Sequence, residues 1–167
     1  MKQWFRIPAA LMLMAAAPPC LAAQAAAARP RATVLFVCEH GTVRSLLAKV
    51  LFEQYAAEVG LSMQAVSRGT RADSLVPPFM QQGLADDHIA LGTWRPQTLR
   101  RRDLATAAHV VSFDVPAAAT AAARGSREQW DGLPSVSRDY AAGRDAIKAR
   151  VHQLVDSLRR AARPARR

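Results

Sequence analysis

The feature that most constrains this chain is an apolar run that ends in a cysteine and leads into a helical pattern. Residues 32–37 read ATVLFV, and Cys38 follows directly. After a further short loop, apolar side chains recur at the spacing of one helix face: Leu47, Val50, Leu51 and Tyr55. This pattern predicts a buried strand over 32–37, a loop over 38–43 and a helix over 44–58.

The rest of the chain alternates between short apolar runs and helical patterns. Further strands are predicted at 62–67, 109–113 and 128–130. Further helices are predicted at 77–84, 95–107, 115–125 and 140–160. This alternation indicates the α/β class with a parallel sheet. Ligands of such sheets bind beyond the carboxyl ends of the strands, which is where the Cys38 loop is expected to lie.

The N-terminal segment has the layout of a secretory signal peptide. MKQWFR is basic, IPAALMLMAAAPP is apolar but too short to span a bilayer, and Ala23-Gln24-Ala25 fits a signal peptidase site. The expected organisation is a signal peptide at 1–23, a flexible leader at 24–31, one domain at 32–160 and a basic tail at 161–167. We therefore expect a periplasmic or secreted protein with no stable membrane span.

The composition of the chain indicates which kinds of partner to expect. Its 167 residues carry a net charge of +10, which suits anionic substrates. The basic residues are not interleaved with aromatic ones, so no nucleic-acid partner is expected. The histidines have no ligand partners at useful spacing, so no metal or other cofactor is expected. Composition does not indicate the oligomeric state.

Cys38 is the only cysteine that remains after the expected cleavage, because Cys20 lies in the signal segment. An internal disulfide is therefore excluded, which leaves either an inert buried thiol or a reactive one. Thiols at helix N-termini ionise more readily than free thiols, and Arg44 can hold two oxygens of a tetrahedral oxyanion. Ser45 can donate to the sulfur, and Gly41 allows the left-handed backbone of a tight cradle. These parts suit phosphoryl transfer through a cysteinyl-phosphate intermediate.

The stretch VLFVCEHGTVRSLLAKVLFEQYA resembles the N-terminus of the low-molecular-weight protein tyrosine phosphatases and the related thioredoxin-coupled arsenate reductases. The similarity continues in VSRGTRA, HVVSFD and WDGLPSVSRDY, and it covers residues 32–160. It implies a three-layer α/β/α fold with a four-stranded parallel sheet. It also implies that Cys38 is the nucleophile and Arg44 the oxyanion clamp. The implied phosphate cradle is the backbone of Glu39, His40, Gly41, Thr42 and Val43.

The sequence departs from the family pattern at several positions. Gly41 stands where the family usually has an asparagine, and Glu39 adds a negative charge beside the nucleophile. Ser135 stands where the family has the aspartate that protonates the leaving oxygen. Asp131 and Asp139 are nearby carboxylates that are candidates for this role.

Three functional hypotheses remain open from the sequence. The first is a phosphatase of phosphomonoesters, including phosphotyrosine; the second is a relative that binds oxyanions without turnover. The third is an arsenate reductase that uses an external thiol, because no cysteine follows Cys38 to support an internal relay. His40 is interpreted either as a residue that contacts the substrate or tunes the thiolate, or as a residue of the rim. Trp94 and Trp130 are interpreted either as pocket walls or as core residues.

Overall fold

The computed structural model describes residues 31–162, which form an α/β fold around one central strand. Strand β1 (Ala32–Cys38) is buried from Val34 onward, because it has a hydrogen-bonded neighbour on each side and helices on both faces. The predicted signal peptide, nearly all of the leader and nearly all of the C-terminal tail lie outside the described residues.

The sheet has four parallel strands in the order β2-β1-β3-β4. β2 (Met63–Gly69) and β3 (His109–Ser112) pair with β1, and β4 (Ser126–Gln129) pairs with β3 at the edge. β4 consists of exposed polar residues, which protect an edge strand against pairing with other chains. The carboxyl ends of β1 and β2 meet at Cys38 and Gly69, which are register partners.

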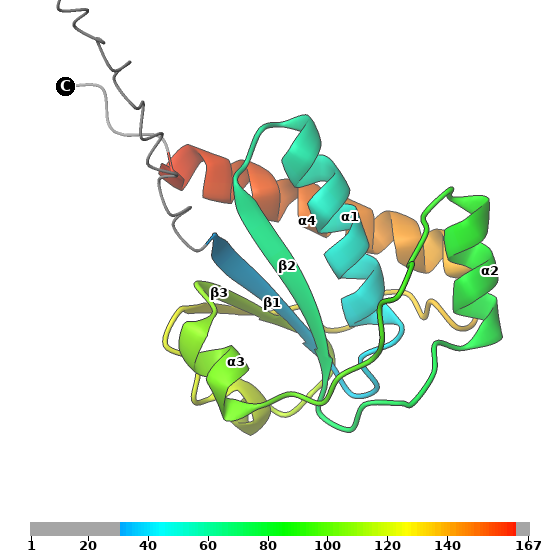
Figure 1. Cartoon of the computed structure of the whole chain (residues 1–167), viewed down its shortest axis with the longest axis horizontal. Coiled ribbons are helices and arrows are strands. Elements are labelled where there is room, and N and C mark those ends of the chain that lie inside the picture. Colours follow the sequence, from blue (N-terminus) through cyan, green and yellow to red (C-terminus); the bar gives the residue numbers. More distant parts are fainter. Residues whose placement is uncertain (1–30, 163–167) are drawn as a thin grey trace, which may run out of the picture.

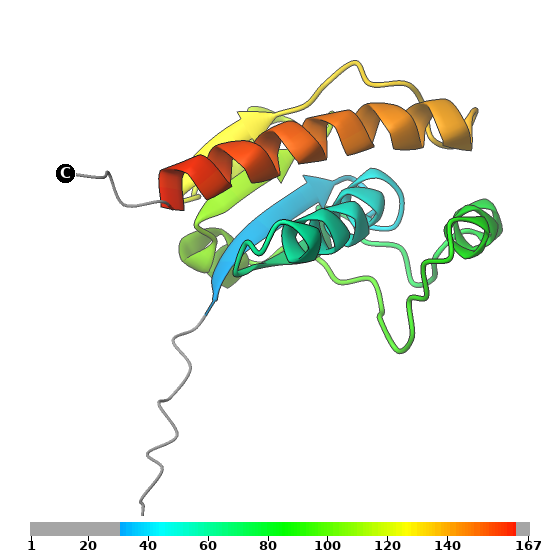
Figure 2. The ribbon, with the colours of Figure 1, turned by 90° about the horizontal axis from the view of Figure 1, so that it is seen from above.

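Helices cover both faces of the sheet. α1 (Arg44–Glu58) and α4 (Tyr140–Ala162) pack together on one face, whereas α3 (Arg101–Thr106) packs on the other (Figure 1). α2 (Pro78–Asp86) lies beyond the carboxyl ends of the strands (Figure 2). The predicted three-layer fold with a four-stranded parallel sheet is confirmed.

Aromatic rings fill the larger core, on the side of α1 and α4. The ring centroid of Phe36 lies 5.9 Å from that of Phe52 and 6.2 Å from that of Trp130. Trp130 is only 3% exposed and meets Phe113 edge-on at 5.5 Å. Trp130 is therefore a core residue, and its interpretation as a pocket wall is wrong. Trp94 is half-buried and packs against the same core.

The sequence predictions fail at two helices. In the segment predicted as a helix over 95–107, only α3 is helical, because Gly69 exchanges backbone hydrogen bonds with Gln97 and Leu99. In the segment predicted as a helix over 115–125, only a 3-10 turn forms, at Ala117–Thr120. The alanines of that segment favour a helix, but they offer no apolar face large enough to anchor one.

The helix predicted over 77–84 begins at Pro78 and continues through Gly83 to Asp86. Gly83 leaves room for the Tyr140 ring, because a Cβ atom at this position would lie only 2.4 Å from that ring. None of the helices within residues 31–162 is both long and apolar enough to cross a membrane.

Candidate active site

Cys38 is the last residue of β1, and its sulfur is held by the loop that follows. The backbone N–H of Gly41 donates to Sγ at 3.1 Å, and Ser45 Oγ lies 3.0 Å from the same sulfur. Ser67 Oγ lies 2.8 Å from Ser45 Oγ and 2.9 Å from the carbonyl oxygen of Gly41. Cys38 is 7% exposed and lines an open cavity, and the Gly41 N–H and the Ser45 hydroxyl flank its sulfur.

Gly41 allows the loop to pack against the end of β2. Its φ angle is +71°, and a Cβ atom here would lie 2.6 Å from the backbone nitrogen of Gly69. Only glycine combines this left-handed conformation with so close an approach. The replacement of the family's asparagine therefore agrees with the local geometry.

The segment after β2 braces the loop from outside. The backbone N–H groups of Thr70, Arg71 and Asp73 donate to the carbonyl oxygens of Cys38, Glu39 and His40, at 3.0, 2.8 and 3.1 Å respectively. These bonds turn the loop carbonyls toward residues 70–73. The arrangement suits an anion cradle, because an anion needs N–H groups and not carbonyls on the inner side.

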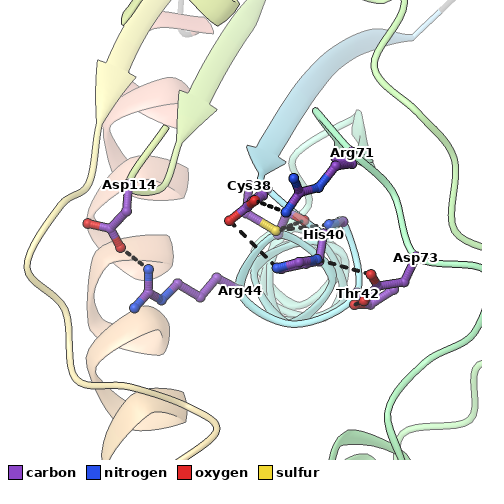
Figure 3. A network of polar contacts seen from close by, with 10 residues as sticks. Cys38, His40, Thr42, Arg44, Arg71, Asp73 and Asp114 are labelled. Atoms are coloured by element: carbon purple, nitrogen blue, oxygen red, sulfur yellow. Dashed lines mark hydrogen bonds and ion pairs between the residues drawn. The ribbon is translucent and has the colours of Figure 1, made fainter. Parts of the chain in front are cut away.

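Asp73 adds a side-chain brace that sequence reasoning did not identify. Its Oδ2 accepts a hydrogen bond from Thr42 Oγ1 at 2.9 Å, and its Oδ1 lies 3.0 Å from His40 Nδ1 (Figure 3). Thr42 is fully buried, whereas the side chain of His40 is 47% exposed. One carboxylate thus fixes two side chains of the predicted cradle. Asp73 lies more than 30 residues from both in the chain, so no local pattern marks it.

The charge of Glu39 has a partner close by. Its carboxylate lies 2.6 Å from Arg71 Nη2 and 3.6 Å from His40 Nε2. The repulsion expected between Glu39 and an ionised Cys38 is thereby reduced.

Arg44 begins α1, and its guanidinium forms an ion pair with Asp114 (Figure 3). Asp114 follows Phe113 with a φ angle of +44°. Its backbone N–H donates to Asp131 at 2.8 Å, and its side chain accepts from the N–H of Gly132 at 3.3 Å. The predicted oxyanion clamp therefore meets a carboxylate of the protein itself.

The two carboxylates considered for proton donation, and the serine that replaces the family's aspartate, lie in different surroundings. Asp131 accepts hydrogen bonds from the backbone of Asp114 and from Gln129, and Asp139 accepts one from the N–H of Ala142 at the start of α4. Neither aspartate is among the described residues that line the cavity, whereas Ser135 is. The carboxylates of the lining belong instead to Glu39, Asp73 and Asp114.

The cavity above Cys38 has a volume of about 360 Å³ and a mixed lining. Its apolar walls come from the loop after β1, the α2 region, the end of β3 and the segment between β4 and α4: Val43, Pro77, Phe79, Phe113 and Val136. An oxyanion bound over the sulfur would therefore place its organic substituent against apolar surface. Among residues 31–162, no cluster of side chains is suited to hold a metal ion.

Comparison with known proteins agrees with this architecture. The chain resembles YfkJ from Bacillus subtilis, with a TM-score of 0.69 and 19% identity over 80% of this chain and 98% of that one. A low molecular weight phosphotyrosine phosphatase from Vibrio cholerae gives a TM-score of 0.65 and 19% identity, over 79% of this chain and 99% of that one. The thioredoxin-dependent arsenate reductase of Corynebacterium glutamicum gives 0.64 and 23%, over 80% of this chain and 65% of that one. At such identities, these likenesses establish the fold alone.

No curated protein sequence matches the chain. A family model does match it: low molecular weight phosphotyrosine protein phosphatase, over residues 33–131. The matched region is more than half of the chain and includes Cys38, Arg44 and Asp114. The chain therefore belongs to the low molecular weight phosphotyrosine protein phosphatase family.

Proposed function

We propose that this protein hydrolyses phosphomonoesters through a cysteinyl-phosphate intermediate on Cys38. One observation carries the proposal: the Cys38 sulfur accepts a hydrogen bond from the Gly41 N–H and lies 3.0 Å from Ser45 Oγ, at a cavity that Arg44 also lines. A nucleophile, donors that stabilise negative charge and a cation for the phosphoryl oxygens are thus present together.

The chemistry follows from these positions. The Cys38 thiolate attacks phosphorus, the bond from phosphorus to the ester oxygen breaks, and the phosphoryl group is left on sulfur. Water then attacks phosphorus and releases inorganic phosphate, and the electron pair of the S–P bond returns to Cys38. Ser45 assists this second departure, because its hydroxyl is placed to donate to the leaving sulfur.

The apolar walls of the cavity favour an aryl substituent. Pro77 and Phe79 line the cavity at the start of α2. Phe113, directly after β3, and Val136, between β4 and α4, also line it. A phenyl ring esterified to the phosphoryl group would bury apolar surface against these side chains. We therefore propose aryl phosphates, including phosphotyrosine, as the substrate class.

Oxyanion binding without turnover is the second candidate. Two observations favour it. Asp114 occupies the Arg44 guanidinium that would bind the phosphoryl oxygens, and Ser135 cannot supply a proton at neutral pH. Arsenate reduction with an external thiol is a variant of the same site. A structural neighbour is described as a thioredoxin-dependent arsenate reductase, and Cys38 is the one cysteine within residues 31–162.

One pair of assays separates these functions. Wild type and Cys38→Ser are incubated with p-nitrophenyl phosphate, and separately with arsenate plus a small thiol. Turnover of the ester that is lost in the variant supports the phosphatase, and arsenite formation supports the reductase. Phosphate binding without either reaction supports the binding protein. Equal turnover by both proteins contradicts cysteine chemistry.

We also propose that the protein acts in the periplasm or outside the cell. The proposal rests on the basic and apolar composition of residues 1–23 and on the small residues around position 23. Cell fractionation with an antibody to the folded domain, combined with sequencing of the mature N-terminus, tests it. Recovery of uncleaved protein from the cytoplasm would contradict it.

A further inference from the structure

The leaving oxygen of a phosphomonoester needs a proton, and the carboxylates that line the cavity are all engaged. Asp114 is paired with Arg44, Glu39 is paired with Arg71, and Asp73 accepts from Thr42 while also contacting His40. Each of these carboxylates thus already has a partner within the protein. This points to a proton donor of another kind among the residues that line the cavity.

His40 has the geometry that such a donor needs. Its imidazole lines the cavity beside Cys38 and is 47% exposed, so a substrate can reach it (Figure 3). Nδ1 lies 3.0 Å from Oδ1 of Asp73, which fixes the orientation of the ring. The second nitrogen, Nε2, lies 3.6 Å from a Glu39 oxygen, which is too far for a hydrogen bond.

We propose that His40, held in place by Asp73, is the general acid and base of this active site. The inference rests on the proposed phosphatase function and adds a catalytic residue to it. As the Cys38 thiolate attacks phosphorus, the ester oxygen leaves with its bonding electron pair and takes the proton from Nε2 of His40. The neutral imidazole then accepts a proton from the attacking water, while the electron pair of the S–P bond returns to sulfur. Each turnover restores both side chains.

Charged groups of both signs lie near the imidazole. Glu39 and Asp73 contact the ring, Arg71 is paired with Glu39, and Arg44 and Asp114 line the same cavity. Histidine is the side chain whose ordinary titration falls between pH 5 and 8. Because a general acid must hold its proton to act, kcat/KM is expected to fall on the alkaline side of the pH profile.

His40→Asn is the sharpest variant, because an asparagine amide can still donate to Asp73 in place of Nδ1 but carries no titratable proton. The measurement is kcat/KM for a series of aryl phosphates whose leaving phenols range from strongly to weakly acidic. A weakly acidic phenol needs the proton most. The expected loss is about 10²–10⁴-fold for phenyl phosphate and much smaller for 2,4-dinitrophenyl phosphate. The alkaline fall of kcat/KM should also disappear.

His88→Asn is the matched control. His88 is exposed, lies outside the lining of the cavity and has a φ angle of +58°, which asparagine tolerates. This variant should retain the wild-type dependence on the leaving group. Thr42→Val is a second control, because it removes the other hydrogen bond to Asp73. Damage to the brace alone should lower kcat/KM equally for every ester.

The outcomes separate the two proposals. A loss in His40→Asn that is uniform across the series overturns the assignment of His40 while leaving cysteine chemistry in place. Turnover that survives Cys38→Ser, or no turnover of any ester by wild type, overturns the phosphatase function and this inference with it. Asp73→Asn tests the positioning residue: it should lower kcat/KM most for phenyl phosphate, as His40→Asn does, and a uniform loss would contradict its role through His40.

Discussion

The guanidinium of Arg44 and the carboxylate of Asp114 are ion-paired at the cavity that Cys38 lines. Arg44 comes from the first turn of α1, and Asp114 comes from the residues directly after β3. Their side chains are 25% and 40% exposed. A phosphoryl group that enters the cavity must therefore compete with Asp114 for Arg44.

Asp114→Asn should strengthen the binding of inorganic phosphate. Ion pairs that are partly exposed contribute about 0.2–1 kcal/mol, so release of Arg44 is expected to lower the inhibition constant of phosphate by up to about fivefold. The measurement is competitive inhibition by phosphate. Asp86→Asn, on the exposed side of α2, removes the same charge at a distance and should change the constant little. Weaker binding in Asp114→Asn would contradict competition.

Gly41→Ala should destabilise the protein more than Gly60→Ala does. Both glycines have φ angles near +70°, so both variants suffer the same backbone strain, about 1 kcal/mol. Only at position 41 would the new Cβ atom approach backbone, at 2.6 Å from Gly69, whereas nothing lies within 4 Å at position 60. Urea unfolding measures the difference. Equal losses would show that the contact between the loop and β2 relaxes without cost.

Ser45→Ala should slow the release of phosphate from the intermediate. Hydrogen bonds to charged groups contribute about 1.5–3 kcal/mol, which corresponds to a loss in kcat of about 10–150-fold. Because formation of the intermediate is less affected, p-nitrophenol should appear in a burst that is followed by slow turnover. Rapid-mixing kinetics measure it. A variant without a burst, whose two steps slow equally, would contradict the specific role of Ser45 in the departure of sulfur.

His109 should make the fold less stable in mild acid. It is buried at the start of β3, and burial lowers its pKa below the usual value of about 6.5, although Glu128 partly opposes this shift. The unfolded chain therefore binds a proton at a higher pH than the folded protein does. The free energy of unfolding should accordingly decrease as the pH falls through about 6.5 toward the folded-state pKa. Urea unfolding between about pH 7.5 and pH 5 measures this decrease.

His109→Gln provides the control for that decrease, because it removes the titrating group near Ser126 and Glu128. The variant should show a flatter dependence of the unfolding free energy on pH. An identical slope in both proteins would assign the acid sensitivity to other groups.

The parts of the molecule that the sequence predicted well are those with a local period. The pattern from Ala32 to Glu58 predicted the central strand and the helix after it. A strand buried on both faces is a continuous apolar run, and a helix buried along one side repeats apolar residues at helical spacing. The same pattern located Cys38 at the mouth of the turn. The segment before α3 was mispredicted because its partner is the end of β2, nearly 30 residues earlier in the chain.

The carboxylates near the Cys38 loop were harder to predict, because they are distant from it in the sequence and only folding brings them close. Asp73 and Asp114 reach the loop from two other segments, and each contacts a residue at least 31 positions away. In a polar loop, no sequence pattern distinguishes a carboxylate that holds neighbouring side chains in place from one that is exposed to solvent. HVVSFD did carry the resemblance to the family, and Asp114 is its last residue. The ion pair between Asp114 and Arg44 became visible only in three dimensions.

The direct test of this account is to trap the phosphoryl group on the enzyme. Wild type is mixed with p-nitrophenyl phosphate, quenched in acid within the first turnovers, digested and analysed by mass spectrometry, with Ser45→Ala used to prolong the life of the intermediate. We predict one added phosphoryl group on the peptide that contains Cys38, in both proteins and more in the variant. Ester turnover without phosphate on that peptide, or with phosphate on a different residue, would contradict the account.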